Sequence, residues 1–170
     1  MSLHRAAPRS LAAVAYIPDG HEGTRLTLEV MRRLVKEWRA NPEMIAFARS
    51  LVEGVQEKNF REEAAAVHAY VRDQIRYTLD PNEVETVQAP NVTIETGHGD
   101  CDDKSVLVAT LLEILGHPAR FAAIGFAPDV FEHVYVETKI GADWIGVETT
   151  EPVELGWQPQ GFVSKMLRHI

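Results

Sequence analysis

The feature that most constrains the fold of this chain is a run of apolar residues over positions 106–115. This run predicts an α-helix, because Asp100 is a favourable N-cap with Asp103 three positions later, and because Gly116 and Pro118 end the pattern. The apolar positions lie on nearly every side of the helix: Val106, Leu107, Val108, Leu111, Leu112, Ile114 and Leu115. A helix that is apolar all round is buried. The rest of the chain is therefore expected to pack around it.

The only cysteine of the chain, Cys101, lies in the first turn of this helix, directly after the glycine-rich stretch 97–99. A thiol there is close to free backbone N–H groups and to the positive end of the helix dipole, which favour a thiolate and can hold an oxyanion. The flanking Asp100, Asp102 and Asp103 would raise its pKa unless they act as caps or a cation offsets them. A histidine partner would offset them. The alternative, a small buried apolar side chain, fits poorly beside three aspartates.

Composition limits the classes of protein to which the chain can belong. Its 170 residues suit one domain, and a hydrophobic content of 45% is enough for one core of ordinary size. The formal net charge of −8 argues against nucleic-acid and anionic-membrane binding. One cysteine excludes an internal disulfide and multi-cysteine zinc sites. The apolar run over residues 11–17 is too short to span a bilayer. We expect a cytoplasmic protein, and we expect neither a metal nor a cofactor.

Before Cys101 the chain has mostly helical patterns. Residues 1–23 are expected to form an irregular arm, and residues 24–170 a single domain. Apolar residues recur at helical spacing in three segments: 24–39, 42–55 and 60–76. His68, in the third segment, is expected on the helix surface. The stretch 82–97 has loop composition with one short strand candidate, 91–96, and its length favours a functional loop that forms a wall of a substrate groove.

After Pro118 the pattern becomes alternating and predicts an antiparallel meander of three strands: 119–126, 131–138 and 143–149. His133 lies on the second strand and Glu148 on the third. If residues 140–141 form the turn, these two side chains are directly opposite each other. If residues 141–142 form it, they are diagonal neighbours, still within reach. Either register therefore puts the imidazole and the carboxylate together on one face.

These residues form a candidate catalytic set. A cysteine nucleophile needs a base that takes its proton, and a carboxylate that orients the imidazole and stabilises its charged form. Cys101, His133 and Glu148 provide the three groups in that chain order. Asp143 and Glu132 are other candidates for the acid.

Four segments of the chain resemble the transglutaminase-like superfamily, a branch of the papain-like cysteine enzymes. The segments are 99–101 at the start of the cysteine helix, 116–120 before a strand, 133–137 and 144–150. The resemblance covers about residues 64–152. The family pattern usually ends in Asp-Pro-Thr, where this chain has Glu148-Thr149-Thr150. Residues 77–81 and 88–90 also resemble transglutaminase-like proteins of bacteriophages and prophages.

The resemblance implies an α+β fold, in which N-terminal helices precede a central nucleophile helix packed on an antiparallel sheet. It also implies acyl transfer. Cys101 would attack an amide carbonyl of a protein or peptide substrate, and His133 would protonate the leaving amine. The backbone N–H of Cys101 and the side chain of Tyr77 would hold the oxyanion. Water or an amine would then release the acyl group.

Two other functions remain open from the sequence. The chain could be a non-catalytic interaction module with the same fold, for example in phage assembly. His98, Asp100, Cys101 and Asp102 could instead form a metal site, although their spacing matches no zinc or calcium pattern.

Three further residues are candidates for the substrate groove: His98, Asp100 and Trp144. For His98 the alternative is a solvated loop position, and for Trp144 it is packing in the core. The residues after Pro152 are expected to form a tail that packs back on the domain or meets a partner.

Overall fold

The structure is a computed structural model that describes residues 20–79 and 86–170. Its helices are α1 (Gly20–Trp38), α2 (Pro42–Leu51), α3 (Phe60–Gln74), α4 (Pro90–Thr96) and α5 (Cys101–Ile114). Its strands are β1 (Arg76–Tyr77), β2 (His98–Gly99), β3 (Ala119–Gly125), β4 (His133–Ile140), β5 (Asp143–Val147) and β6 (Ser164–His169). The described part of the chain contains no helix long and apolar enough to cross a membrane. α1 begins inside the predicted arm, whose residues 1–19 lie outside the described residues.

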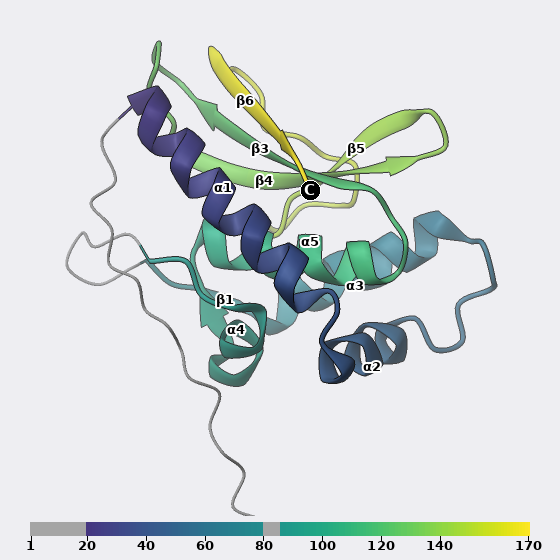
Figure 1. Ribbon diagram of the computed structural model, residues 1–170. Helices are drawn as coiled ribbons and strands as arrows, with labels where there is room; N and C mark the ends of the chain where they lie inside the picture. Colours follow the sequence, from purple (N-terminus) through teal and green to yellow (C-terminus); the bar gives the residue numbers. More distant parts are fainter. Residues whose placement is uncertain (1–19, 80–85) are drawn as a thin grey trace, which may run out of the picture.

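The central element is α5, around which the other elements pack (Figure 1). It contacts all four of the other helices as well as strands β3 and β4. Every residue from 103 to 112 is buried. The expected N-cap is present as a capping box, because Asp100 accepts hydrogen bonds from the N–H groups of Asp102 and Asp103 while the Asp103 carboxylate accepts one from the N–H of Asp100. The prediction of a buried central helix is confirmed.

Strands β3 to β6 form one antiparallel sheet with the strand order β5-β4-β3-β6, which lies above α5 in Figure 1. The face toward α5 contributes Phe121, Ala123, Val134 and Val136 to the main hydrophobic core. The Ser105 hydroxyl of α5 donates to the Val134 carbonyl over 3.2 Å and ties the helix to β4. The predicted α+β fold, with a central helix on an antiparallel sheet, is confirmed.

The opposite face of the sheet carries a buried ion cluster. Glu137 on β4 is only 1% exposed, and it accepts hydrogen bonds from Arg120 on β3 at 2.7 Å and from Lys165 on β6 at 2.6 Å. The buried Tyr135 hydroxyl donates to the same carboxylate over 3.0 Å. One carboxylate therefore links three neighbouring strands.

Two segments contain elements that the sequence did not predict. Residues 91–96 belong to helix α4 and not to a strand, because Pro90 occupies the first turn and Gly97 ends the helix in the left-handed conformation with φ 69°. The tail predicted after Pro152 packs back on the domain, which was one of its two alternatives, and it does so as strand β6. This strand pairs with residues 120–125 of β3 and directs Met166 toward the core.

Candidate active site

Cys101 is the first residue of α5, and its side chain is half-buried where the helix meets β4. Its Sγ donates a hydrogen bond to Asp102 Oδ1 over 3.6 Å and also lies beside the backbone N–H of Val134. Because Val134 follows His133 directly, the fold brings the thiol next to the main chain of the predicted base. Between these two described residues, no hydrogen bond joins the thiol to the imidazole.

The surroundings of Cys101 favour the protonated thiol. Burial raises its pKa most, and the charges of Asp102 and Asp100 raise it further, so that it lies well above the ordinary value of 9.0. The Val134 N–H acts in the opposite direction but does not outweigh these effects. The conflict that the sequence predicts between flanking aspartates and a reactive thiol is therefore present. Cys101 needs a base to become a nucleophile.

His133 and Glu148 are in direct contact. Val136 pairs with Val147, which is the register of the 141–142 turn and makes the two residues diagonal neighbours. His133 Nε2 lies 2.6 Å from Glu148 Oε2, and the carboxylate is 1% exposed. The predicted pairing of imidazole and carboxylate is confirmed.

The other two candidate acids lie elsewhere. Asp143 begins β5, at the turn end of the β4–β5 hairpin, and is exposed. Glu132 precedes His133, but its carboxylate accepts a hydrogen bond from the Phe126 N–H over 3.2 Å. Of the three candidates, Glu148 is therefore the acid whose carboxylate bonds to His133.

Glu148 is held as a carboxylate despite its burial. Burial alone would raise its pKa, but the hydrogen bond and charge of His133 outweigh that effect, and so the pKa is lowered. Thr150 adds two further hydrogen bonds, from its N–H and from its hydroxyl, both 2.7 Å from Glu148 Oε1. A buried anion is thus available to orient the imidazole and to stabilise its protonated form.

Tyr77 lies beside the nucleophile helix. β1 pairs in parallel with β2, which sets Tyr77 against Gly99, two residues before Cys101. The buried Lys104 of α5 donates to the Ile75 carbonyl over 2.6 Å and fixes the entry to β1. Burial raises the pKa of the Tyr77 hydroxyl most. Its role as an oxyanion donor stays a prediction.

The loop before Cys101 is held by contacts that the sequence analysis did not predict. The buried Asp103 carboxylate accepts hydrogen bonds from the backbone N–H and the side-chain amide of Gln88, both at 2.7 Å. Gly99 packs against the same side chain, and a Cβ at this position would lie 2.6 Å from Asp103 Cβ. Only glycine fits there, so the entry to α5 has one tightly defined path.

His98 and Trp144, two groove candidates, occupy different regions. His98 is half-buried in β2, three residues before the thiol. Trp144 pairs with Lys139 toward the far end of the hairpin. The Arg120 guanidinium lies over the Trp144 ring, with Arg120 Cζ 4.1 Å from the ring centre. The structure therefore brings His98 and Asp100 toward the candidate site but not Trp144.

His68 is buried, and the prediction of a surface position is wrong. Its side chain is 2% exposed, and its Nε2 lies 2.6 Å from the main-chain carbonyl of Glu148. The helical pattern of α3 identified the apolar face, but only the contact with Glu148, directly after the end of β5, shows that a histidine belongs to that face.

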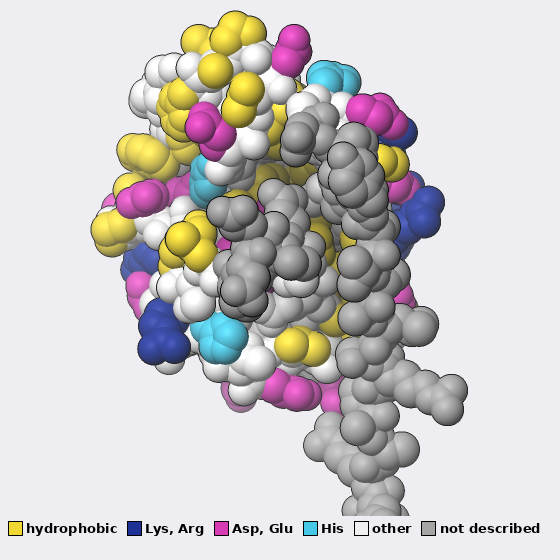
Figure 2. Space-filling model, turned by 90° about the vertical axis from the view of Figure 1, so that its left-hand side faces the viewer, with side chains coloured by type: hydrophobic (Ala, Val, Ile, Leu, Met, Phe, Trp, Pro, Cys, Tyr) yellow, Lys and Arg dark blue, Asp and Glu magenta, His cyan; other side chains and the backbone are white. Residues whose placement is uncertain are grey.

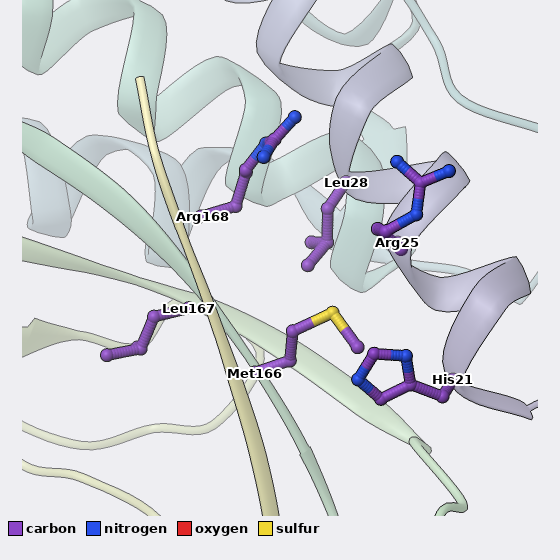
Figure 3. Close-up of a pocket in the computed structure, with 6 residues that line it drawn as sticks. All are labelled: His21, Arg25, Leu28, Met166, Leu167 and Arg168. Carbon is purple, nitrogen blue, oxygen red and sulfur yellow. The ribbon is translucent and has the colours of Figure 1, made fainter.

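Two hollows in the surface lie away from the thiol. Figure 3 shows one between α1 and β6, with a volume of about 180 Å³ and this lining: His21, Arg25, Leu28, Met166, Leu167 and Arg168. Both of its arginines are paired, Arg25 with Glu22 and Arg168 with Glu29. The other, of about 160 Å³, lies among α1, α2 and α4. Neither hollow includes Cys101, His133 or Glu148.

The metal-site alternative gains no support. Asp100 serves as the N-cap of α5 and Asp102 accepts from the thiol. Within residues 20–79 and 86–170, no group of three or more His, Cys, Asp or Glu side chains is arranged to hold a metal ion.

Comparison with known families agrees with this geometry. Residues 45–149, more than half of the chain, match the family model of the transglutaminase-like superfamily. The chain belongs to the transglutaminase-like superfamily. A search of curated proteins found no match.

Solved structures share this transglutaminase-like fold at low sequence identity. A candidate cysteine protease from Cytophaga hutchinsonii is 19% identical, with a TM-score of 0.54 over 73% of this chain and 42% of that one. A candidate protease from Parabacteroides distasonis is 15% identical, with a TM-score of 0.63 over 96% of this chain and 34% of that one. LapG of Legionella pneumophila is 15% identical, with a TM-score of 0.50 over 74% of this chain and 75% of that one.

These similarities show the fold. The transglutaminase-like chain spans less than half the length of the first two of these proteins. The narrower prediction of a bacteriophage-type subgroup gains no support from the three structures.

In this transglutaminase-like chain, we expect Asp102→Asn to make Cys101 more reactive. The substitution removes the charge that, after burial, contributes most to the raised pKa of the thiol. The alkylation rate by iodoacetamide at neutral pH is expected to rise about tenfold, since one pKa unit is a tenfold change in thiolate. Asp143→Asn, at an exposed position far along the hairpin, is the control. An unchanged rate in Asp102→Asn would contradict the electrostatic explanation.

Proposed function

We propose that the chain is a cysteine-dependent acyl-transfer enzyme that acts on amide bonds of proteins or peptides. Cys101 is the nucleophile, His133 the base and Glu148 the orienting acid in this proposal. The observation that carries it is the 2.6 Å contact between His133 Nε2 and a carboxylate that is 1% exposed. A buried carboxylate on an imidazole is the pair that a cysteine nucleophile requires, and the main-chain N–H directly after this histidine lies beside the only thiol of the chain.

The contact with Glu148 determines which nitrogen of His133 can act as the base. A carboxylate accepts hydrogen bonds, so Nε2 carries the proton and Nδ1 is left as the acceptor. In the proposed reaction Nδ1 takes the proton of Cys101 and the thiolate attacks the amide carbonyl. The imidazolium then gives that proton to the leaving amine, which departs as the acyl-thioester forms.

The oxyanion of this reaction would lie at the N-terminus of α5. The backbone N–H of Cys101 is among the first of the helix and has no carbonyl partner within it. The hydroxyl of Tyr77 is our candidate for the second donor, supported by the pairing of Tyr77 with Gly99, two residues before Cys101. Water as acceptor gives hydrolysis, and an amine gives transamidation.

The raised pKa of the thiol has a consequence for this mechanism. A thiol that its surroundings keep protonated does not react until a base takes its proton. The proton is therefore transferred to His133 when the two side chains meet, and Glu148 stabilises the resulting imidazolium.

Exposed apolar side chains near His133 support a polypeptide substrate. Phe126, Val130 and Val163 are 53%, 44% and 63% exposed. The connection from β3 to β4 carries the first two and leads directly to His133, and the Val163 N–H bonds to the Gly125 carbonyl at 2.9 Å. Figure 2 shows hydrophobic side chains gathered at the top of the face, where this connection lies in Figure 1. A patch of this kind suits apolar side chains of a bound chain.

The test is the alkylation rate of Cys101 by iodoacetamide as a function of pH, in the wild type and in His133→Ala. Because the chain has one cysteine, the readout is unambiguous. In this structure the thiol is kept protonated and bonds to Asp102, so the test looks for the conformation in which it meets His133. If the wild type reaches that conformation, we expect reactivity with an apparent pKa well below that of an isolated thiol, since His133 supplies the cation. His133→Ala is expected to move that pKa to the high value that burial and the aspartates dictate. His169→Ala, at an exposed position of β6, is the control.

One observation favours a second candidate, a non-catalytic interaction module. In this structure the thiol bonds to Asp102 and not to His133. If Cys101 is not alkylated at neutral pH and its alkylation profile is the same in His133→Ala, the acyl-transfer proposal fails and the interaction module takes its place.

A further inference from the structure

We propose that His68 and Thr150 are positioning residues that hold Glu148 from two sides, one through its main chain and the other through its carboxylate. The inference rests on the proposed function of Glu148. It names the residues that hold a glutamate in the geometry needed to orient His133. Neither residue touches the thiol. Both would act through the contact between Glu148 and His133.

The need for such support follows from where Glu148 lies. β5 ends at Val147, so the ladder between β4 and β5 does not extend to the main chain of Glu148. Its side chain also has one more rotatable bond than the aspartate usual in the family pattern. A side chain with more rotamers loses more entropy when it is held in one geometry. Contacts outside the sheet must therefore define where the carboxylate points.

Thr150 supplies the contacts to the carboxylate. Its N–H and its hydroxyl both donate to Oε1 at 2.7 Å, which leaves Oε2 for His133 Nε2 at 2.6 Å. The two oxygens of Glu148 are thus used separately, and rotation of the carboxylate would break both sets of bonds. Hydrogen bonds to a charged group are among the stronger ones in proteins.

His68 supplies the contact to the main chain. Its Nε2 lies 2.6 Å from the Glu148 carbonyl, which can only accept, so Nε2 donates. Burial lowers the pKa of His68 and keeps the ring neutral, which leaves this single directed donor. One turn further along α3, Arg72 donates to the Val153 carbonyl over 2.9 Å. A rigid helix therefore anchors both ends of the segment that carries Glu148 and Thr150.

The experiment compares deletion with conservative replacement at each position. Thr150→Val removes the hydroxyl at nearly constant shape, whereas Thr150→Ser keeps it. His68→Leu removes the buried donor, whereas His68→Gln retains an N–H near the position of Nε2. The matched control is His117→Leu, because His117 is also buried and also bonds to α3, through Glu63 at 2.7 Å, but it lies away from Glu148.

The readout is the pH profile of Cys101 alkylation, with thermal unfolding measured alongside. We expect Thr150→Val to lower the rate at neutral pH about tenfold and to move the apparent thiol pKa upward, since a carboxylate that has lost one of its two donors at Oε1 is held less firmly and stabilises the imidazolium less. His68→Leu is expected to act in the same direction. Serine and glutamine should restore most of the wild-type profile. His117→Leu should lower the unfolding temperature and leave the profile unchanged.

The outcomes separate this inference from the proposed function. If the wild-type profile depends on His133 but Thr150→Val and His68→Leu leave it unchanged, the positioning roles are overturned and the catalytic proposal stands. If both variants shift the profile no more than His117→Leu, their role is structural only, and the inference fails. If the alkylation profile of the wild type is the same as that of His133→Ala, the proposed function fails, and the inference, which rests on it, fails as well.

Discussion

Glu148→Gln is expected to lower the rate of Cys101 alkylation at pH 7 about 100-fold and to move reactivity to alkaline pH. The side-chain amide has one acceptor oxygen, but three donors converge on the carboxylate, from His133 Nε2 and from the N–H and hydroxyl of Thr150. If the amide oxygen of glutamine accepts from His133, its NH₂ group faces the Thr150 N–H, so that two donors oppose each other. In the reverse orientation the NH₂ group faces the Nε2–H of His133. The imidazolium also loses its buried counter-charge.

Glu148→Asp is the informative comparison. It keeps the charge and matches the family pattern, but it withdraws the carboxylate by one C–C bond, about 1.5 Å, from a contact that is now 2.6 Å. We therefore expect aspartate to be a poor replacement here, with reactivity closer to that of glutamine than to that of the wild type. Wild-type reactivity in Glu148→Gln would remove Glu148 from the proposed mechanism.

Glu137→Gln is expected to destabilise the fold by about 3 kcal/mol, because removal of one member of a buried ion cluster leaves its partners uncompensated. We take the lower end of the usual range because the side chains of Arg120 and Lys165 are 16% and 26% exposed and can be rehydrated. The cluster joins β3, β4 and β6, so the loss should weaken the attachment of β6 most. Urea unfolding measures the free energy directly.

The pH dependence of this stabilisation has a defined sign. Burial would raise the pKa of Glu137, but hydrogen bonds from Lys165 and Arg120 outweigh it, so the folded pKa lies below the ordinary 4.5. The stability that the carboxylate contributes is therefore present above about pH 4.5 and is lost as the pH falls through the folded pKa. Glu137→Gln should consequently lose less stability on acidification than the wild type.

Glu22→Gln is the control for Glu137→Gln. Glu22 pairs with Arg25 at 2.6 Å, a distance equal to that between Glu137 and Lys165, but both side chains of this pair are exposed. We expect little change in the free energy of unfolding for this surface pair. An equal loss in the two variants would contradict the assignment of Glu137 to a buried cluster.

Much of the candidate site could be predicted from the sequence, because the relevant patterns are local. Asp100 and Asp103 start α5, the apolar run buries it, and the glycines before it define its entry, all within a few residues of Cys101. The pairing of His133 with Glu148 was also accessible, because both possible turns leave the two side chains on one face. Side chains alternate between the two faces along a strand. The two possible turns differ by two positions in the pairing, and a shift of two residues keeps every side chain on its face.

Other features depended on partners distant in the sequence. The register was resolved only by the turn at 141–142, and β6 was recognisable only through its pairing with β3. Helix α4 was mistaken for a strand because a segment of seven residues is too short for either periodicity to be decisive. Burial of His68 required the end of β5 to lie against α3.

The sequence alone was enough for the central helix, for Cys101 and His133, and for a carboxylate on the same face as the imidazole, since these follow from the spacing of residues near one another along the chain. The α+β class followed from the resemblance to the transglutaminase-like superfamily. Only the tertiary structure decided that Glu148 and not Asp143 or Glu132 meets His133, and that Cys101 has a raised pKa. Contact and burial depend on which distant segments pack together, and the free energy of that packing is a property of the whole fold.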